Sequence, residues 1–141
     1  MNFDWLVKLS SCLLLISMLA WAKNVPPSHS SPTMDSDYIS ALATANHFLY
    51  AWQSQDEEAG MIMLTDGAKH HISQGKLDLF FSHTGVASYQ VYRGKKMGKG
   101  RYVFPVSLFT AIAGKNAHTH SYRSQIVILQ TGSDWAVEKL P

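Results

Sequence analysis

Histidine is the residue type in this chain best suited to holding a metal ion, and seven histidines occur. His118 and His120 are two residues apart, so on a strand both side chains would lie on one face and could bind a single Zn or Cu ion. A third ligand would have to come from His70, His71 or His83, which precede the predicted strands. Adjacent residues do not point together on a helix, so His70 and His71 do not complete a ligand set. We therefore expect these histidines to lie on the surface, with no bound metal or cofactor.

Charge divides the chain into an acidic part and a basic part. Residues 35–82 hold seven acids and two lysines, whereas residues 86–131 hold seven basic residues and no acid. The basic part could attract an anionic ligand or an acidic partner surface. It could also be a solubilising hairpin tip that keeps a sheet edge from pairing, and we favour this second interpretation. The formal net charge of +2 is too small to indicate nucleic-acid binding.

Arg123 is the exception among the basic residues. It lies inside the longest predicted strand, where a solvated charge is less expected. If it points into a pocket, its guanidinium would orient a carboxylate or a phosphate.

Helical patterns fill the part of the chain that follows residue 34. Asp35 or Ser36 offers an N-cap, and apolar residues then recur at helical spacing as far as Trp52, which predicts a first helix of about five turns. Asp56 offers the N-cap of a short second helix that ends near residues 66–67. Residues 69–75 fit no single pattern, and residues 76–82 predict a third helix.

After Gly85 the pattern becomes alternating, which predicts consecutive antiparallel strands. Pro105 cannot donate a ladder hydrogen bond, so it indicates an edge, a bulge or a bend. The order of helices followed by strands is typical of an α+β domain. The strands are expected at residues 86–93, 101–109, 118 or 120–130 and 135–140, with a mobile basic hairpin loop at 94–100.

Three segments carry a resemblance to a known superfamily. They are ATANHFLYAWQSQDEEAGMIML (residues 43–64), KLDLFFS (76–82) and GSDWAVEKLP (132–141). This layout resembles the NTF2-like superfamily, the cone-shaped α+β fold of nuclear transport factor 2, ketosteroid isomerase and SnoaL-type polyketide cyclases. The resemblance implies N-terminal helices packed on a curved antiparallel sheet, with a pocket between them. It also implies a common mode of homodimerisation through the outer face of the sheet.

Alternate strand positions would point into such a pocket. We expect polar ligand contacts from Tyr102, Tyr122, Arg123 and Gln125. A slip of one residue in the strand assignment would invert this set.

The resemblance also raises the question of catalysis. The isomerase relatives need a carboxylate base, together with a Tyr and a neutral Asp that hold the enolate. Asp56 and Asp66 are the candidate bases, although both also fit helix capping. No Asp or Glu occurs in residues 86–131, so the sheet core offers no second acid. We therefore expect a domain without catalytic residues, and keep an enzyme that uses Asp56 or Asp66 as the alternative.

The N-terminus predicts export from the cytosol. Lys8 precedes an apolar run at residues 9–20, and Ala20-Trp21-Ala22 places small residues where a signal peptidase requires them. We expect a signal peptide at 1–22, a flexible Pro- and Ser-rich linker at 23–34 and the domain at 35–141; an uncleaved anchor is the alternative. Cys12 is the only cysteine, so the mature chain would lack disulfides. It precedes the bulk of the apolar run, which argues against a lipoprotein box.

The sequence therefore predicts a secreted or periplasmic NTF2-like domain, without a stable membrane anchor after cleavage. We expect it to bind a small, mostly apolar molecule or a protein partner. A purely structural module that dimerises through its sheet is the third alternative.

Overall fold

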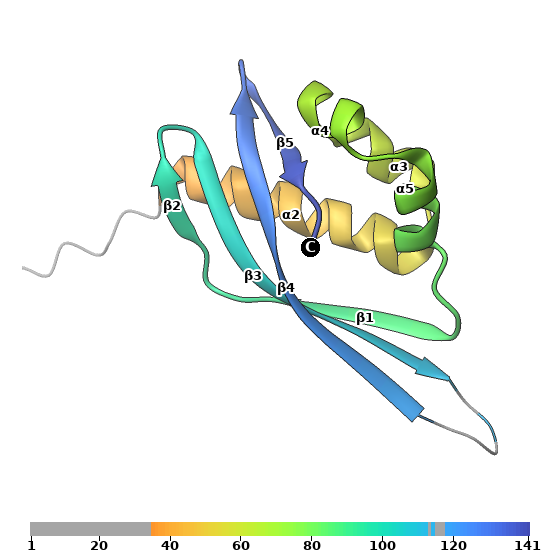
Figure 1. Ribbon diagram of the computed structural model, residues 1–141. Helices are drawn as coiled ribbons and strands as arrows, with labels where there is room; N and C mark the ends of the chain where they lie inside the picture. The colour runs from red at the N-terminus through yellow and green to blue at the C-terminus, as the bar shows by residue number, and fades with distance from the viewer. Residues whose placement is uncertain (1–34, 113, 115–117) are drawn as a thin grey trace, which may run out of the picture. The chain divides into compact units, whose positions relative to one another are not determined.

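The computed structural model describes residues 35–112, 114 and 118–141 (Figure 1). The predicted signal peptide and linker lie outside these described residues. Among the helices of the described residues, none combines the length and the hydrophobicity of a membrane-spanning segment.

The longest helix is α2, Ser36–Ser54. The Asp35 carboxylate caps it by accepting a hydrogen bond from the Asp37 amide, as predicted. Gln55 ends the helix in the left-handed conformation, at φ 57°. Phe48, Leu49 and Trp52 lie on one face and are buried. This helix can therefore serve as the central support for the sheet.

Three short helices follow, where the sequence predicted two. They are α3 (Glu57–Ile62), α4 (Asp66–His71) and α5 (Gln74–Phe81). Asp56 caps α3 through the Ala59 amide, as predicted. The additional helix is α4, and Thr65 caps it through the Ala68 amide. The third predicted helix corresponds to α5, which begins two residues earlier than expected.

The sheet is antiparallel, in the order β1-β3-β4-β5, with β2 also paired to β3. Its strands are β1 (Val86–Val91), β2 (Lys95–Gly98), β3 (Arg101–Ile112), β4 (His118–Thr131) and β5 (Asp134–Lys139). The prediction of a mobile loop at 94–100 is wrong, because Lys95 and Lys96 pair with Val103 and Tyr102 of β3. The prediction of an edge, a bulge or a bend at Pro105 is confirmed. On one side of β3, the pairing with β1 ends at Val106 and the pairing with β2 starts at Val103, so Pro105 lies in the gap between them.

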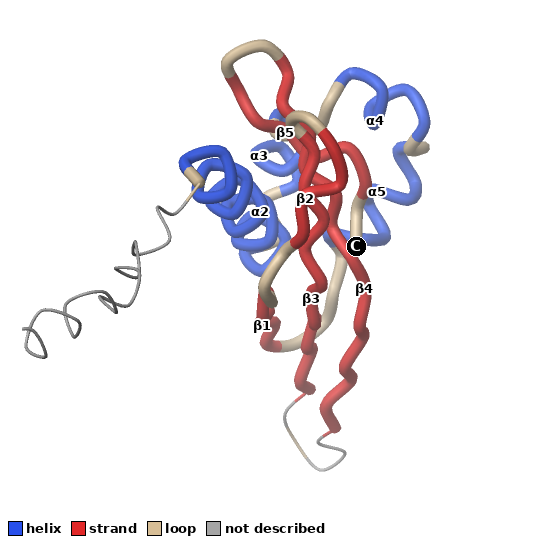
Figure 2. Tube along the Cα trace, turned by 90° about the vertical axis from the view of Figure 1, so that its left-hand side faces the viewer, coloured by secondary structure: helices blue, strands red, loops and turns tan. Residues whose placement is uncertain are grey.

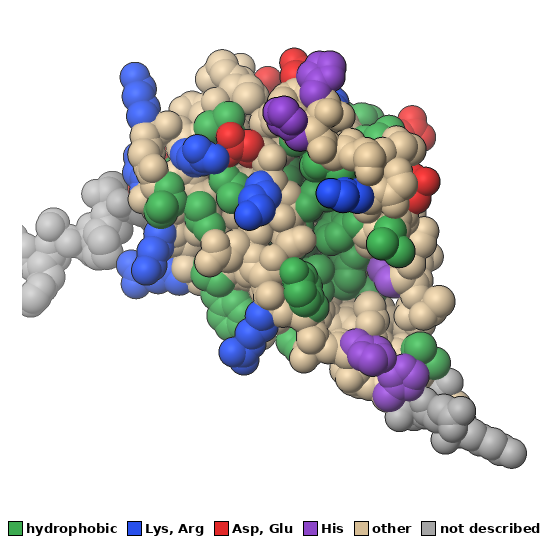
Figure 3. Space-filling model, in the orientation of Figure 1, with side chains coloured by type: hydrophobic (Ala, Val, Ile, Leu, Met, Phe, Trp, Pro, Cys, Tyr) green, Lys and Arg blue, Asp and Glu red, His purple; other side chains and the backbone are tan. Residues whose placement is uncertain are grey.

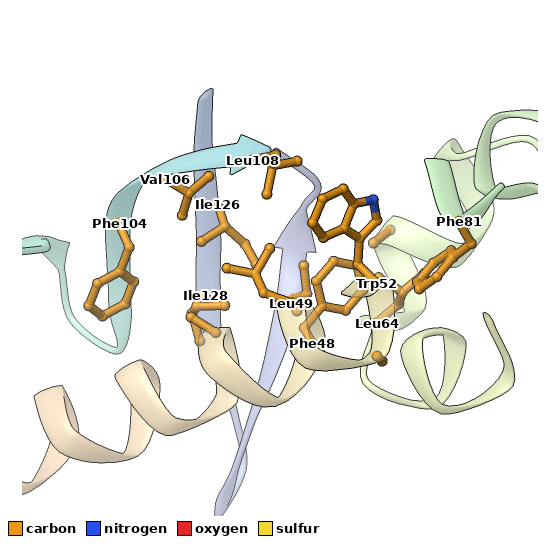
Figure 4. Close-up of a cluster of buried hydrophobic side chains, with 14 of the residues drawn as sticks. Phe48, Leu49, Trp52, Leu64, Phe81, Phe104, Val106, Leu108, Ile126 and Ile128 are labelled. Carbon is orange, nitrogen blue, oxygen red and sulfur yellow. The ribbon is translucent and has the colours of Figure 1, made fainter. Parts of the chain in front are cut away.

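The hydrophobic core lies between α2 and one face of the sheet, which we call the inner face (Figure 4). On β3 the inner face carries Tyr102, Phe104, Val106 and Leu108, and on β4 it carries Ile126 and Ile128. The alternate positions form the outer face, which includes Ser107, Arg123, Gln125 and Leu129. Figure 2 shows the strands lying between α2 on one side and the α4–α5 pair on the other. The architecture is α+β, as predicted.

Candidate functional site

A large pocket lies between α4, α5 and the end of β5, rather than beneath α2. Its volume is about 960 Å³. Beneath α2 the space is packed, since Phe48, Phe104 and Ile126 are each fully buried. Leu129 and Thr131 of the outer face line the pocket together with the C-terminal Leu140 and Pro141. In Figure 3 hydrophobic side chains gather in this region, between the end of the chain and α5.

The pocket combines an apolar wall with a charged rim. The wall comes from Ala68, Ile72, Leu79, Phe80, Leu129 and Leu140, and the rim from Asp66, His71, Lys76, Glu138 and Lys139. A mostly apolar cavity with a few polar groups is the usual form of a small-molecule site, and this volume lies in the usual range. Charges of both signs lie on the rim, so the pocket can contact an apolar body and a polar end of the same ligand.

Backbone pairing fixes α4 beside β5. The Thr65 amide donates to the Val137 carbonyl at 2.9 Å, and the Val137 amide donates to the Met63 carbonyl at 2.8 Å. Leu64 thus forms a parallel bridge with Val137 and extends the sheet by one short segment. Because Thr65 also caps α4, the start of that helix is set by the sheet edge.

A side-chain bond holds α5 against α2. The indole Nε1 of Trp52 donates to the Phe80 carbonyl at 2.9 Å, and the Phe48 and Phe80 rings stack with centroids 6.0 Å apart. Phe80 lines the pocket, so this bond positions one wall of the site.

The two candidate bases differ in their relation to the pocket. Asp66 lines it, in the first turn of α4, whereas Asp56 lies elsewhere as the cap of α3. The Asp66 side chain is 95% exposed, and its contact is an ion pair with Lys69 at 4.0 Å. Glu138 supplies a second carboxylate to the pocket lining. Its Oε2 lies 2.6 Å from Nη2 of Arg101, the first residue of β3.

The four predicted ligand contacts do not meet at one site. Tyr102 is buried on the inner face, and Tyr122 shares that face but is 60% exposed. Arg123 and Gln125 lie on the outer face, because their positions alternate with those of the tyrosines. None of the four lines the large pocket. Arg123 instead lines a second, smaller cleft of about 280 Å³.

The predicted histidine pair is close in space. The His118 and His120 rings lie edge to face, with centroids 4.7 Å apart. No group of three or more His, Cys, Asp or Glu side chains suited to a metal occurs within residues 35–112, 114 and 118–141. His83 is held by the first helix, because its Nε2 contacts the Trp52 carbonyl at 2.9 Å.

A cluster that the sequence did not reveal joins the start of α2 to the sheet. The Tyr102 hydroxyl donates to Oδ2 of Asp35 at 2.7 Å, and Nζ of Lys96 lies 3.4 Å from the same oxygen. The hydrogen bond from Tyr102 is the main reason that the pKa of Asp35 lies below its ordinary value. Burial, followed by the Asp35 contact, raises the pKa of Tyr102. The pKa of Lys96 is also raised, first by Tyr102 and then by Asp35.

Comparison with known proteins supports the fold and leaves the activity open. No protein-family model matches the chain, and no curated protein matches its sequence. The helices and the curled antiparallel sheet form an NTF2-like cone. Among solved structures, the chain is similar to a ketosteroid isomerase-like protein from Erwinia carotovora atroseptica, at a TM-score of 0.59 and 12% sequence identity. The match covers 73% of this chain and 92% of the other. At this identity the likeness establishes the fold alone.

Proposed function

We propose that this domain acts outside the cytosol as a binding protein for a small, mostly apolar molecule. The observation that carries the proposal is the pocket of about 960 Å³ between α4, α5 and β5. Its apolar wall would bury the body of the ligand, and its charged rim would contact a polar group. Export rests on the signal-like N-terminus, residues 1–22.

The rim carboxylates of Asp66 and Glu138 are paired with Lys69 and Arg101. Among the described residues no ion pair engages Lys76 or Lys139, so these two lysines favour a ligand with an acidic end. We therefore choose an anionic aromatic dye, 1-anilinonaphthalene-8-sulfonate, as the probe. Its fluorescence rises when it enters an apolar site, and the measurement uses the full chain.

A matched pair of variants separates the pocket from other apolar surface. Leu79 lines the pocket and is 77% exposed, whereas Ile62 does not line it and is 73% exposed. Both residues lie on short helices, and neither contributes to the buried core. We expect Leu79→Asp to weaken probe binding by about tenfold, in line with the loss of one apolar contact and the added charge. Ile62→Asp should leave binding unchanged. An equal response of the two variants would reject the pocket as the binding site.

A second candidate function is proton-transfer catalysis with Asp66 as the base. The presence of Asp66 in the pocket lining favours it, as does the fold shared with a ketosteroid isomerase-like protein. The test is the isomerisation of a β,γ-unsaturated ketosteroid to its conjugated form, followed by ultraviolet absorbance. Activity that is lost in Asp66→Asn and kept in Asp56→Asn would support catalysis, because only Asp66 lines the pocket. No turnover by the unmodified protein would leave binding as the function.

A further inference from the structure

The smaller cleft, on the outer face of the sheet, brings the guanidinium of Arg123 together with the hydroxyl groups of Tyr92 and Ser107. Its volume is about 280 Å³. It is lined by Tyr92, Pro105, Val106, Ser107, Arg123 and Ser124. The cleft does not share a residue with the large pocket.

The register of β3 and β4 explains why these side chains meet at the cleft. Ser107 of β3 and Arg123 of β4 are direct partners across the strands, so their side chains leave the sheet on the same face. Tyr92 follows β1 and reaches the same place, since its hydroxyl lies 3.3 Å from Oγ of Ser107. Ser107 is only 2% exposed, so the floor of the cleft is fixed.

The Ser107 hydroxyl can donate a hydrogen bond to a ligand. The Tyr92 hydroxyl donates its one proton to Oε1 of Gln90 at 3.2 Å. The Ser107 hydroxyl therefore keeps its own proton, which can go to the Tyr92 oxygen or to a ligand oxygen. Ser124 also lines the cleft, but it pairs with Val106 of the inner face, so its side chain leaves the sheet on the side opposite to Arg123.

The positive charge of Arg123 is not balanced by a carboxylate of the cleft lining. No ion pair joins Arg123 to a carboxylate among the residues that the structure describes. No acid occurs in residues 86–131, which include every residue of the cleft. In Figure 3 the lower part of the visible face, toward the end of β3 and the start of β4, displays Lys, Arg and His but no Asp or Glu.

We infer that this cleft binds a small oxyanion, either a carboxylate or a phosphate group. The planar guanidinium of Arg123 can donate two parallel hydrogen bonds to two oxygens of such a group. The hydroxyl of Ser107 then donates to a remaining oxygen lone pair. The inference is independent of the proposed function, because the two sites are lined by different residues.

Titration of the full chain with inorganic phosphate and, separately, with acetate tests the site by amide nuclear magnetic resonance. Chloride at the same ionic strength is the control for general screening. We expect saturable shifts of the Ser107, Arg123 and Ser124 amides with an oxyanion and none with chloride. A response to only one of the two anions would assign the site to that class, whereas no saturable response to either would overturn the inference.

Charge-matched variants locate the binding group. Arg123 is exposed, so Arg123→Gln should fold normally, and we expect it to weaken binding by about tenfold through the loss of a charged hydrogen bond. Lys99→Gln removes the same charge at the turn between β2 and β3, and should leave binding unchanged. Tyr92→Phe should retain binding, because its hydroxyl proton is used by Gln90. Equal losses in the Arg123 and Lys99 variants would show a diffuse charge effect and overturn the site.

Discussion

Tyr102 donates a hydrogen bond to Asp35 across 2.7 Å, which joins the N-cap of α2 to the start of β3. The two residues are far apart in sequence, and each serves another part of the fold. Asp35 also caps the helix, and the Tyr102 ring packs against Tyr38 and Trp135 with centroids 5.8 Å and 5.6 Å away. The first described residue is thus part of the folded domain.

This contact predicts a loss of stability in acid. The pKa of Asp35 in the folded protein is below its ordinary value of 3.8. Its contribution to stability is therefore present above that value and is lost as the pH falls through the folded-state pKa. Asp35→Asn keeps a capping side chain but removes the titration. We expect the melting temperature of the unmodified protein to fall more steeply below about pH 4 than that of Asp35→Asn.

Thermal unfolding followed by circular dichroism between pH 6 and pH 3 makes this comparison. Glu58→Gln is the control, because Glu58 is an exposed carboxylate on α3. If Asp35→Asn and the unmodified protein lost stability in parallel, the Tyr102 bond would not be the source of the acid sensitivity.

Gly60 predicts a strong difference between two glycine substitutions. A Cβ at Gly60 would lie 2.2 Å from Cζ of Phe81, which is buried in the core. We expect Gly60→Ala to destabilise the protein by about 1–3 kcal/mol through overpacking. A Cβ at Gly75 of α5 would meet no atom within 4 Å, so Gly75→Ala should be neutral or stabilising, by up to about 1 kcal/mol. Urea unfolding measures both, and a tolerated Gly60→Ala would contradict the packing of α3 against α5.

The sequence predicted α2 and its cap because a strong periodic pattern and a capping carboxylate agree there. It missed β2, since three glycines and three lysines in residues 94–100 are typical of a loop. Pairing with Val103 and Tyr102 supplies the order that this segment lacks locally. It also left α4 unassigned, because the sheet edge at Val137 helps to place its start.

The sites were harder to predict than the elements. The large pocket draws on residues from α4, α5, β4 and the C-terminus, and no sequence spacing connects these segments. Alternation along β4 places Tyr122 and Arg123 on opposite faces of the sheet, but the sequence pattern does not show which part of the strand is buried. On β4 only Ile126, Val127 and Ile128 are buried, although β5 pairs with β4 from Val127 to Thr131, and Ile126 and Ile128 belong to the core of the inner face.

The predicted signal peptide can be tested by mass spectrometry of the protein recovered from a secreting bacterial host. We expect the mature chain to begin at Lys23, since Ala20 and Ala22 supply the small residues needed for cleavage. Ala22→Gln should block processing, whereas Trp21→Gln at the tolerant position between them should not. Recovery of the intact chain in every case would instead support the anchor alternative.

The hydrogen bond between Trp52 and Phe80 predicts that the stability of α5 and the affinity for the dye change together. Trp52→Phe removes the indole donor and leaves the Phe80 carbonyl unpaired, which we expect to cost about 1 kcal/mol in unfolding free energy. Because Phe80 lines the large pocket, the same variant should weaken binding of the anionic dye. Trp135→Phe is the matched control: Trp135 packs on Tyr102, away from the pocket lining, so this variant should lower stability and leave dye affinity unchanged. Equal effects of the two variants on dye affinity would mean that general loosening, rather than the position of α5, controls the pocket.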